Sequence, residues 1–62
     1  MIEIRLNGEL NTLPRSLSIQ ELVEHIGLDP RKIAVEVNRE VVPKVQHPQR
    51  RLQPGDAVEI VT

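Results

Sequence analysis

The sequence predicts an α+β domain in which one main helix packs on one face of a mixed sheet of four or five strands. Three observations support this fold class. Apolar and polar residues alternate near the start, in the middle and at the end of the chain, as in strands with one buried face. A helical repeat of apolar residues occurs once, between the first two of these regions. A proline or glycine stands at most of the junctions between the regions.

The length and composition allow one small folded domain, which we expect to span residues 1–62. Hydrophobic residues make up 39% of the chain and charged residues 27%, a balance typical of globular proteins. There is no Phe, Tyr or Trp, so the core must consist of Ile, Leu and Val, and no aromatic platform exists for stacking a nucleic-acid base. The formal net charge of −1 also disfavours binding to nucleic acid. With no signal peptide and no apolar run of membrane-spanning length, we expect a cytoplasmic protein without membrane association.

The first two strands are predicted to form a hairpin. Residues 2–6 alternate between apolar and polar side chains. Asn7-Gly8 follows, and this pair tolerates the positive φ angles of a type I′ turn. A return strand is therefore expected over residues 9–13, and Pro14, which lacks a backbone N–H donor, should end it.

The next segment contains the signals of a helix with both ends defined. Ser18 and Glu21 have the spacing of a capping box, and Leu17 and Leu22 occupy the two positions of a hydrophobic staple. Gly27 follows the last turn and should adopt the left-handed conformation that ends a helix. One face of the helix is formed by Ile19, Leu22, Val23 and Ile26.

The second half of the chain predicts two or three more strands. Residues 33–37 alternate clearly, and Val41-Val42 begins a short strand that Pro43 restricts to a sheet edge. Residues 53–56 form a turn before the last strand, residues 57–61. One core should contain Ile2, Ile4, Leu6, Ile19, Leu22, Val23, Ile26, Ile33, Val35, Val37, Leu52, Val58 and Ile60.

No residues have the spacing of an active site or of a metal centre. His25 and His47 lie in different predicted elements, and the chain has no Cys to complete a zinc site. Ser16 and Ser18 have no evident base partner, and Ser18 is explained as a helix cap. We therefore expect no catalytic residue, no metal site and no cofactor.

Basic residues gather in one part of the chain, where Arg50 and Arg51 follow Arg39 and Lys44. Because the chain as a whole is not basic, we interpret them as a solvated edge. A docking patch for an acidic partner surface is the alternative.

The sheet face away from the helix is the predicted partner-binding surface. Ala34, Ala57, Glu59 and Val61 alternate with inward-facing residues and must point to the opposite face. Together with Thr62 at the end of the last strand, they form a small apolar area with charge at its rim, which is a plausible docking site.

Three segments resemble the ThiS-type sulfur carriers of thiamin thiazole biosynthesis. They are L-S-I-Q-E-L-V at residues 17–23, A-V-E-V-N-x-x-V-V-P at residues 34–43 and P-G-D-x-V-E-I-V at residues 54–61. The most specific feature is the occurrence of the second and third patterns together. The resemblance covers nearly the whole chain.

The resemblance implies a fold, a function and two partners. Members of this family have the ubiquitin-like β-grasp fold, in which the last strand is central and parallel to the first. An E1-like adenylating enzyme (ThiF-type) uses ATP to adenylate the C-terminal glycine of the carrier. Sulfur then replaces the adenylate to give a thiocarboxylate, and a thiazole synthase (ThiG-type) takes the sulfur. The carrier is thus a cosubstrate and not an enzyme.

The chain departs from this family at its end. Carriers continue into a short tail that ends in Gly-Gly, whereas this sequence stops at Val61-Thr62. The sulfur-carrying glycine is absent and would follow Thr62, and we expect that a tail is missing from the sequence. The alternatives are a TGS-type or other β-grasp interaction module and a molybdopterin-type sulfur carrier.

Overall fold

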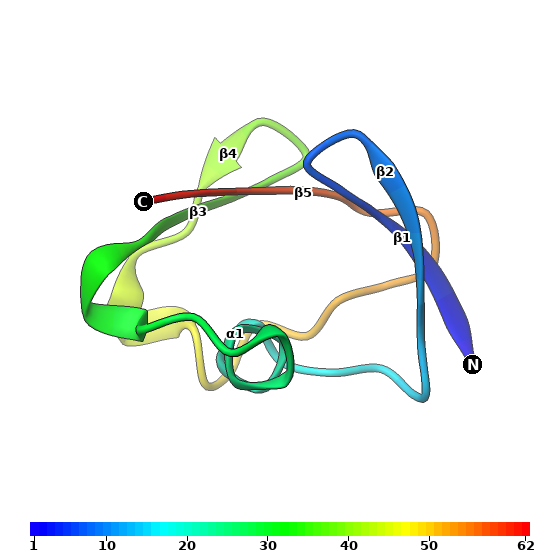
Figure 1. Ribbon diagram of the computed structural model, residues 1–62, viewed down its shortest axis with the longest axis horizontal. Coiled ribbons are helices and arrows are strands. Elements are labelled where there is room, and N and C mark those ends of the chain that lie inside the picture. Colours follow the sequence, from blue (N-terminus) through cyan, green and yellow to red (C-terminus); the bar gives the residue numbers. More distant parts are fainter.

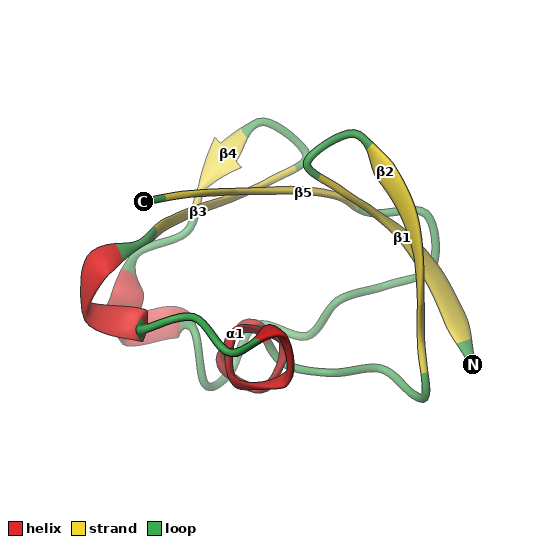
Figure 2. Cartoon of the chain, in the orientation of Figure 1, coloured by secondary structure: helices red, strands yellow, loops and turns green.

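The computed structural model describes residues 1–62 and contains a five-stranded mixed sheet with its helices on one face. The strands are β1 (Ile2–Leu6), β2 (Glu9–Leu13), β3 (Ala34–Val37), β4 (Glu40–Val41) and β5 (Ala57–Val61). The helices are α1 (Ile19–Ile26) and the 3-10 turns η1 (Pro30–Lys32) and η2 (Lys44–Gln46). Figures 1 and 2 show all three helices on the same side of the sheet. The predicted fold class is confirmed.

The last strand of the sequence lies in the centre of the sheet. The strand order is β2-β1-β5-β3-β4, and β5 is parallel to β1 and antiparallel to β3. In the parallel pair Arg5 lies opposite Ala57 and Leu6 lies opposite Val58. The central, parallel last strand that the resemblance implied is therefore confirmed.

The hairpin of β1 and β2 forms as predicted. Asn7 and Gly8 have φ angles of 50° and 84°, the positive values that the type I′ turn requires. The register places Ile2 opposite Leu13 and Leu6 opposite Glu9, so the strands pair along their full length.

Both predicted ends of α1 are also confirmed. The backbone N–H of Glu21 donates to Oγ of Ser18 at 3.1 Å, and the Ser18 N–H donates to Oε1 of Glu21 at 2.9 Å, which completes the capping box. Gly27 has a φ angle of 79°, and the N–H of Leu28 donates to the carbonyl of Val23 at 3.2 Å, as in a Schellman motif. None of the helices combines the length and apolar composition needed to cross a membrane.

The core is assembled from Ile, Leu and Val between the sheet and α1. It contains Ile4, Leu13, Leu17, Ile19, Leu22, Val23, Ile33, Val35, Val37, Val42, Leu52, Val58 and Ile60. Three residues expected inside it, Ile2, Leu6 and Ile26, are only partly buried and pack against its edge. Each is at the end of an element, where fewer neighbours cover a side chain.

Sequence patterning missed three core residues for separate local reasons. Leu13 is the one buried residue of a strand without clear alternation, and Leu17 is buried as half of the hydrophobic staple. β4 ends at Val41, one residue earlier than expected, so the prediction that Val42 belongs to this strand was wrong. The N–H of Val42 donates to the carbonyl of Val35 at 3.0 Å, and its side chain is buried.

The packing of α1 leads to a stability prediction. Leu22 is completely buried, so Leu22→Ala should lower the free energy of unfolding by about 2 to 5 kcal/mol. Ile26→Ala, at a partly buried position of the same helix, should cost less because part of that side chain already contacts water. Urea denaturation of both variants measures the difference. Equal losses in the free energy of unfolding would contradict an orientation of α1 in which Leu22 is buried more deeply than Ile26.

The helix start predicts a dependence of stability on pH. Hydrogen bonding from the Ser18 backbone N–H, and next from Arg15, holds the pKa of Glu21 below its usual value of 4.5. A carboxyl group whose pKa is lower in the folded state stabilises the fold above its unfolded pKa. This stabilisation should therefore disappear as the pH falls from about 4.5 through the lower folded value.

Glu21→Gln should remove the part of the pH dependence that Glu21 causes. Urea denaturation repeated at about pH 2 to pH 7, the range in which carboxyl groups titrate, measures this change. Glu24→Gln, at an exposed position of the same helix, is the matched control and should leave the dependence in place. The same loss of pH dependence in both variants would contradict the assignment to Glu21.

Candidate functional site

The sheet face away from α1 is the candidate binding surface, which we call the outer face. Along β1, β3 and β5 its side chains alternate with more buried ones, and no helix of the chain covers this face (Figure 2). It is formed by Arg5, Leu10, Ala34, Glu36, Val41, Ala57, Glu59 and Val61.

The residues predicted to bind a partner gather on this face. Ala57, Glu59 and Val61 are exposed along β5, whereas the residues between them are buried in the core. Ala34 lies directly opposite Val61 on β3 and is also exposed, and Thr62 follows β5 at the surface. The structure therefore brings the predicted residues together, although their binding to a partner stays a prediction.

Two exposed apolar residues of the outer face were not predicted from the sequence. Leu10 is 60% exposed on β2, across from Arg5, and Val41 is 69% exposed on β4, across from Glu36. Val61 on the central strand is 62% exposed. Single exposed apolar residues are ordinary, but three on one open sheet face provide apolar area for a partner.

Two carboxylates lie opposite each other in the middle of the outer face. Glu36 of β3 pairs in register with Glu59 of β5, and neither takes part in an ion pair. Like charges directly opposite on neighbouring strands destabilise a sheet. A cationic group from a partner would relieve this repulsion, which indicates the kind of chemistry that the surface can bind.

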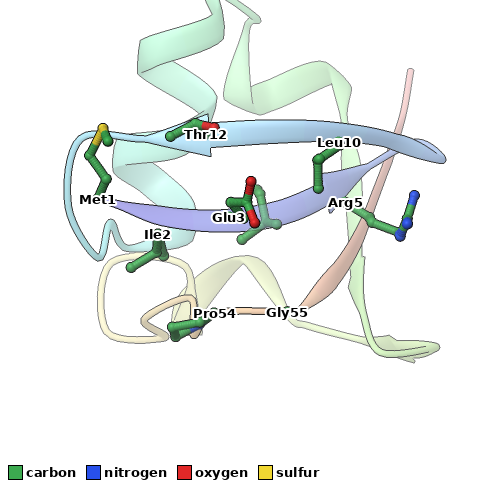
Figure 3. A pocket seen from close by; sticks show the side chains of 9 residues that line it. Met1, Ile2, Glu3, Arg5, Leu10, Thr12, Pro54 and Gly55 are labelled. Atoms are coloured by element: carbon green, nitrogen blue, oxygen red, sulfur yellow. The ribbon is translucent and has the colours of Figure 1, made fainter.

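A shallow hollow of about 540 Å³ extends the outer face across the first hairpin. Figure 3 shows Glu3, Arg5 and Leu10 over the hairpin, with Pro54 and Gly55 beside β1. The hollow adjoins β5 because Arg5 pairs with Ala57 in the sheet. Its lining mixes apolar groups with one acid and one base, which suits a protein surface better than an enclosed substrate.

Two side chains that were weighed as candidates for acid–base or nucleophilic chemistry, His47 and Ser16, make structural contacts. Nε2 of His47 lies 2.9 Å from the carbonyl oxygen of Val42, and the ring is buried, which sequence reasoning did not anticipate. Oγ of Ser16 donates to the carbonyl of Leu52 at 2.8 Å. No group of three or more His, Asp or Glu side chains is placed to hold a metal ion.

The predicted basic grouping also contacts backbone carbonyls. Arg51 donates to the carbonyl of Ser16 at 3.0 Å, and Lys44 donates to that of Arg31 at 3.1 Å. These side chains are exposed, as a solvated edge would be.

One relative contains a segment similar to this chain as a small part of a larger protein. A thiazole synthase from Paramagnetospirillum magneticum is 38% identical over 60 residues. The match covers 97% of this chain but only 18% of that protein.

Other matches cover this chain and its relatives almost fully. The sulfur carrier protein ThiS of Thermus thermophilus is 37% identical over 59 residues, which cover 90% of this chain and 86% of that protein. The crystal structure of the thiamine biosynthesis protein ThiS from Geobacter metallireducens superposes with a TM-score of 0.89 at 27% identity, over 97% of this chain and 91% of that one. The model of the ThiS family matches residues 4–62. The chain therefore belongs to the ThiS family, the sulfur carriers of thiamine biosynthesis, which are carrier proteins and not enzymes.

Proposed function

We propose that this chain carries sulfur as a thiocarboxylate on a glycine that would follow Thr62, and that its outer face docks in turn on an E1-like adenylating enzyme (ThiF-type) and a thiazole synthase (ThiG-type). In the first step the glycine carboxylate attacks the α-phosphorus of ATP and pyrophosphate leaves. A sulfur nucleophile then attacks the acyl carbon and AMP leaves. The domain itself supplies the docking surface and the direction of the tail.

The position of β5 is the observation that carries this proposal. The strand is paired on both sides in the centre of the sheet, and it ends at Val61 with its outer-facing side chains exposed. Figure 1 shows the end of the chain at the tip of β5, well separated from α1. Residues added after Thr62 would therefore extend away from the domain and could enter the active site of another protein.

The proposed tail has a physical requirement at its tip. An extended chain gains about 3.3 to 3.6 Å per residue, so a carboxylate at the end of a sheet strand needs several more residues to reach a recessed nucleotide site. Glycine has no Cβ, which lets the backbone pass through a narrow channel and adopt conformations that strain other residues.

The chemistry of the outer face supports a partner surface that is apolar with a basic group at its centre. Val41 lies across from Glu36 on β4, and Val61 is the next outward residue after Glu59 on β5, so both provide exposed apolar area next to the carboxylate pair. A lysine or arginine placed over the two carboxylates would gain attraction from both, and the repulsion between them would fall.

The thiazole synthase relative supports the second partner. In that protein a segment similar to this chain belongs to the same polypeptide as the rest of a thiazole synthase. Segments joined in one polypeptide have a high effective concentration for each other, which favours functional association. We therefore infer that this chain meets a thiazole synthase in its own pathway.

The docking proposal predicts opposite effects of one substitution on stability and binding. Glu59→Gln should raise the free energy of unfolding by about 0.2 to 1 kcal/mol because it removes the like-charge pair. The same change should weaken binding to the E1-like enzyme, and Glu59→Lys should weaken it further. Urea denaturation and calorimetric titration measure the two effects.

Glu40→Gln is the matched control, because this exposed glutamate of β4 lies opposite Val37 and not opposite a carboxylate. Glu40→Gln should neither raise the free energy of unfolding nor weaken binding to the E1-like enzyme. Unchanged affinity of the Glu59 variants for both partners would place the interface elsewhere.

The carrier function predicts that activation depends on the tail. The chain ending at Thr62 should support no ATP–pyrophosphate exchange by a cognate E1-like enzyme, whereas the same chain with a short flexible tail ending in Gly-Gly should support it. Mass spectrometry after addition of the sulfur donor should then show one oxygen replaced by sulfur. Exchange with the chain ending at Thr62, or none with the tailed chain and an enzyme of proven activity, would refute the proposed role of the tail.

A further inference from the structure

The side chain of Asn7 takes the place of a strand beside the end of β5. The Asn7 backbone N–H donates to the carbonyl of Val58 at 2.9 Å, as in a parallel ladder. Its side-chain Nδ2 donates to the carbonyl of Ile60 at 3.2 Å, and its Oδ1 accepts from the N–H of Ile60 at 2.8 Å. Both backbone groups of Ile60 are thus bound by one amide that is 53 positions away in the sequence.

The need for this contact follows from the shape of the hairpin. β1 pairs with β5 only as far as Val58, because the chain turns back at Gly8 to form β2. The N–H and C=O of Ile60 point to this side, where no strand continues. Unpaired backbone groups next to a buried side chain are costly. A side-chain amide offers the same donor and acceptor as a peptide group and therefore satisfies both.

A second asparagine holds the other end of the same strand. Asn38, in the turn after β3, donates its backbone N–H to the carbonyl of Ala57 at 2.7 Å and accepts from the Ala57 N–H through Oδ1 at 3.0 Å. Its Nδ2 donates to Asp56 at 3.1 Å. Asn7 and Asn38 both adopt positive φ, at 50° and 52°. The first strand residue of β5 is therefore held from the β3 side, and its fourth from the β1 side.

We propose that Asn7 is a positioning residue for sulfur transfer, which fixes the direction in which the chain leaves the sheet after Ile60. This role rests on the proposed function. On the β1 side Asn7 is the contact nearest to the chain end, and without it the strand beyond Val58 would be held only by β3. A strand end paired on one side frays more readily, and a tail that leaves a fraying strand enters a partner's active site in many orientations.

Asn7→Gly tests the contact itself, because glycine keeps the positive φ of the turn and removes only the amide. Asn38→Gly is the matched control, since it makes the same change in the other hairpin turn. Hydrogen exchange followed residue by residue on the chain ending at Thr62 is the measurement. Asn7→Gly should increase the exchange rate of the Ile60 amide, relative to that of the Val35 amide, by up to about tenfold. This factor corresponds to the net free energy of one hydrogen bond. Asn38→Gly should leave this ratio of exchange rates unchanged. Equal ratios in the two variants would show that the Asn7 amide does not hold Ile60.

The positioning role is tested with the tailed forms of the parent and both variants. In ATP–pyrophosphate exchange, Asn7→Gly should lower kcat by up to about tenfold and leave KM for the carrier within about twofold, because the docking face is intact while the tail is misdirected. Asn38→Gly should leave kcat near that of the parent. Equal values of kcat for the two variants would overturn the proposal, since a purely structural contact affects both alike.

The two measurements separate this inference from the proposed function. If the tailed parent is not adenylated by an active enzyme, the proposed function fails and the role of Asn7 in transfer fails with it, while hydrogen exchange still decides whether Asn7 holds Ile60.

If Asn7→Gly does not fold, Asn7→Asp replaces it, because it keeps an oxygen for the Ile60 N–H but offers the Ile60 carbonyl no proton when ionised. Asn11→Asp, on the exposed strand β2, is then the control, and kcat should fall only for Asn7→Asp.

Discussion

The insertion of β5 between β1 and β3 is the constraint on which the rest of this structure depends. The last strand to be made must find backbone partners on both sides, and one of them, β1, stands at the opposite end of the chain. Until β5 is in place, β1 and β3 have no partner in the middle of the sheet and Val58 and Ile60 cannot enter the core. The pairing of β5 therefore both completes the core and places the end of the chain in the centre of the sheet.

The alternation of side chains along β5 gives the strand one buried and one exposed face. Val58 and Ile60 face α1 and the core, while the residues between them face solvent on the outer face. One short helix can cover only one side of the sheet, so the other is left open. Glu36 and Glu59 lie opposite each other on this open side, an arrangement that disfavours the sheet unless a positive charge is brought to it, as in the docking that we propose.

Several polar side chains of the domain stabilise its fold. Ser18 and Glu21 cap α1, while Ser16 and His47 contact backbone carbonyls of connecting segments that lack strand partners of their own. In a chain of 62 residues, loops take up much of the backbone and need such contacts. These four side chains therefore act in the fold of the domain.

The sequence by itself determined the elements whose signals lie within a few residues. Asn7-Gly8 specified the first turn, and Ser18, Glu21 and Gly27 specified both ends of α1, because turns and caps are closed by neighbours along the chain. It also predicted which residues of β5 face outward, since alternation is a local property. Only the tertiary structure decided the register that sets Glu36 against Glu59, the burial of His47 and the pairing of Asn7 with Ile60. These depend on contacts between distant segments, for which a local pattern contains no information.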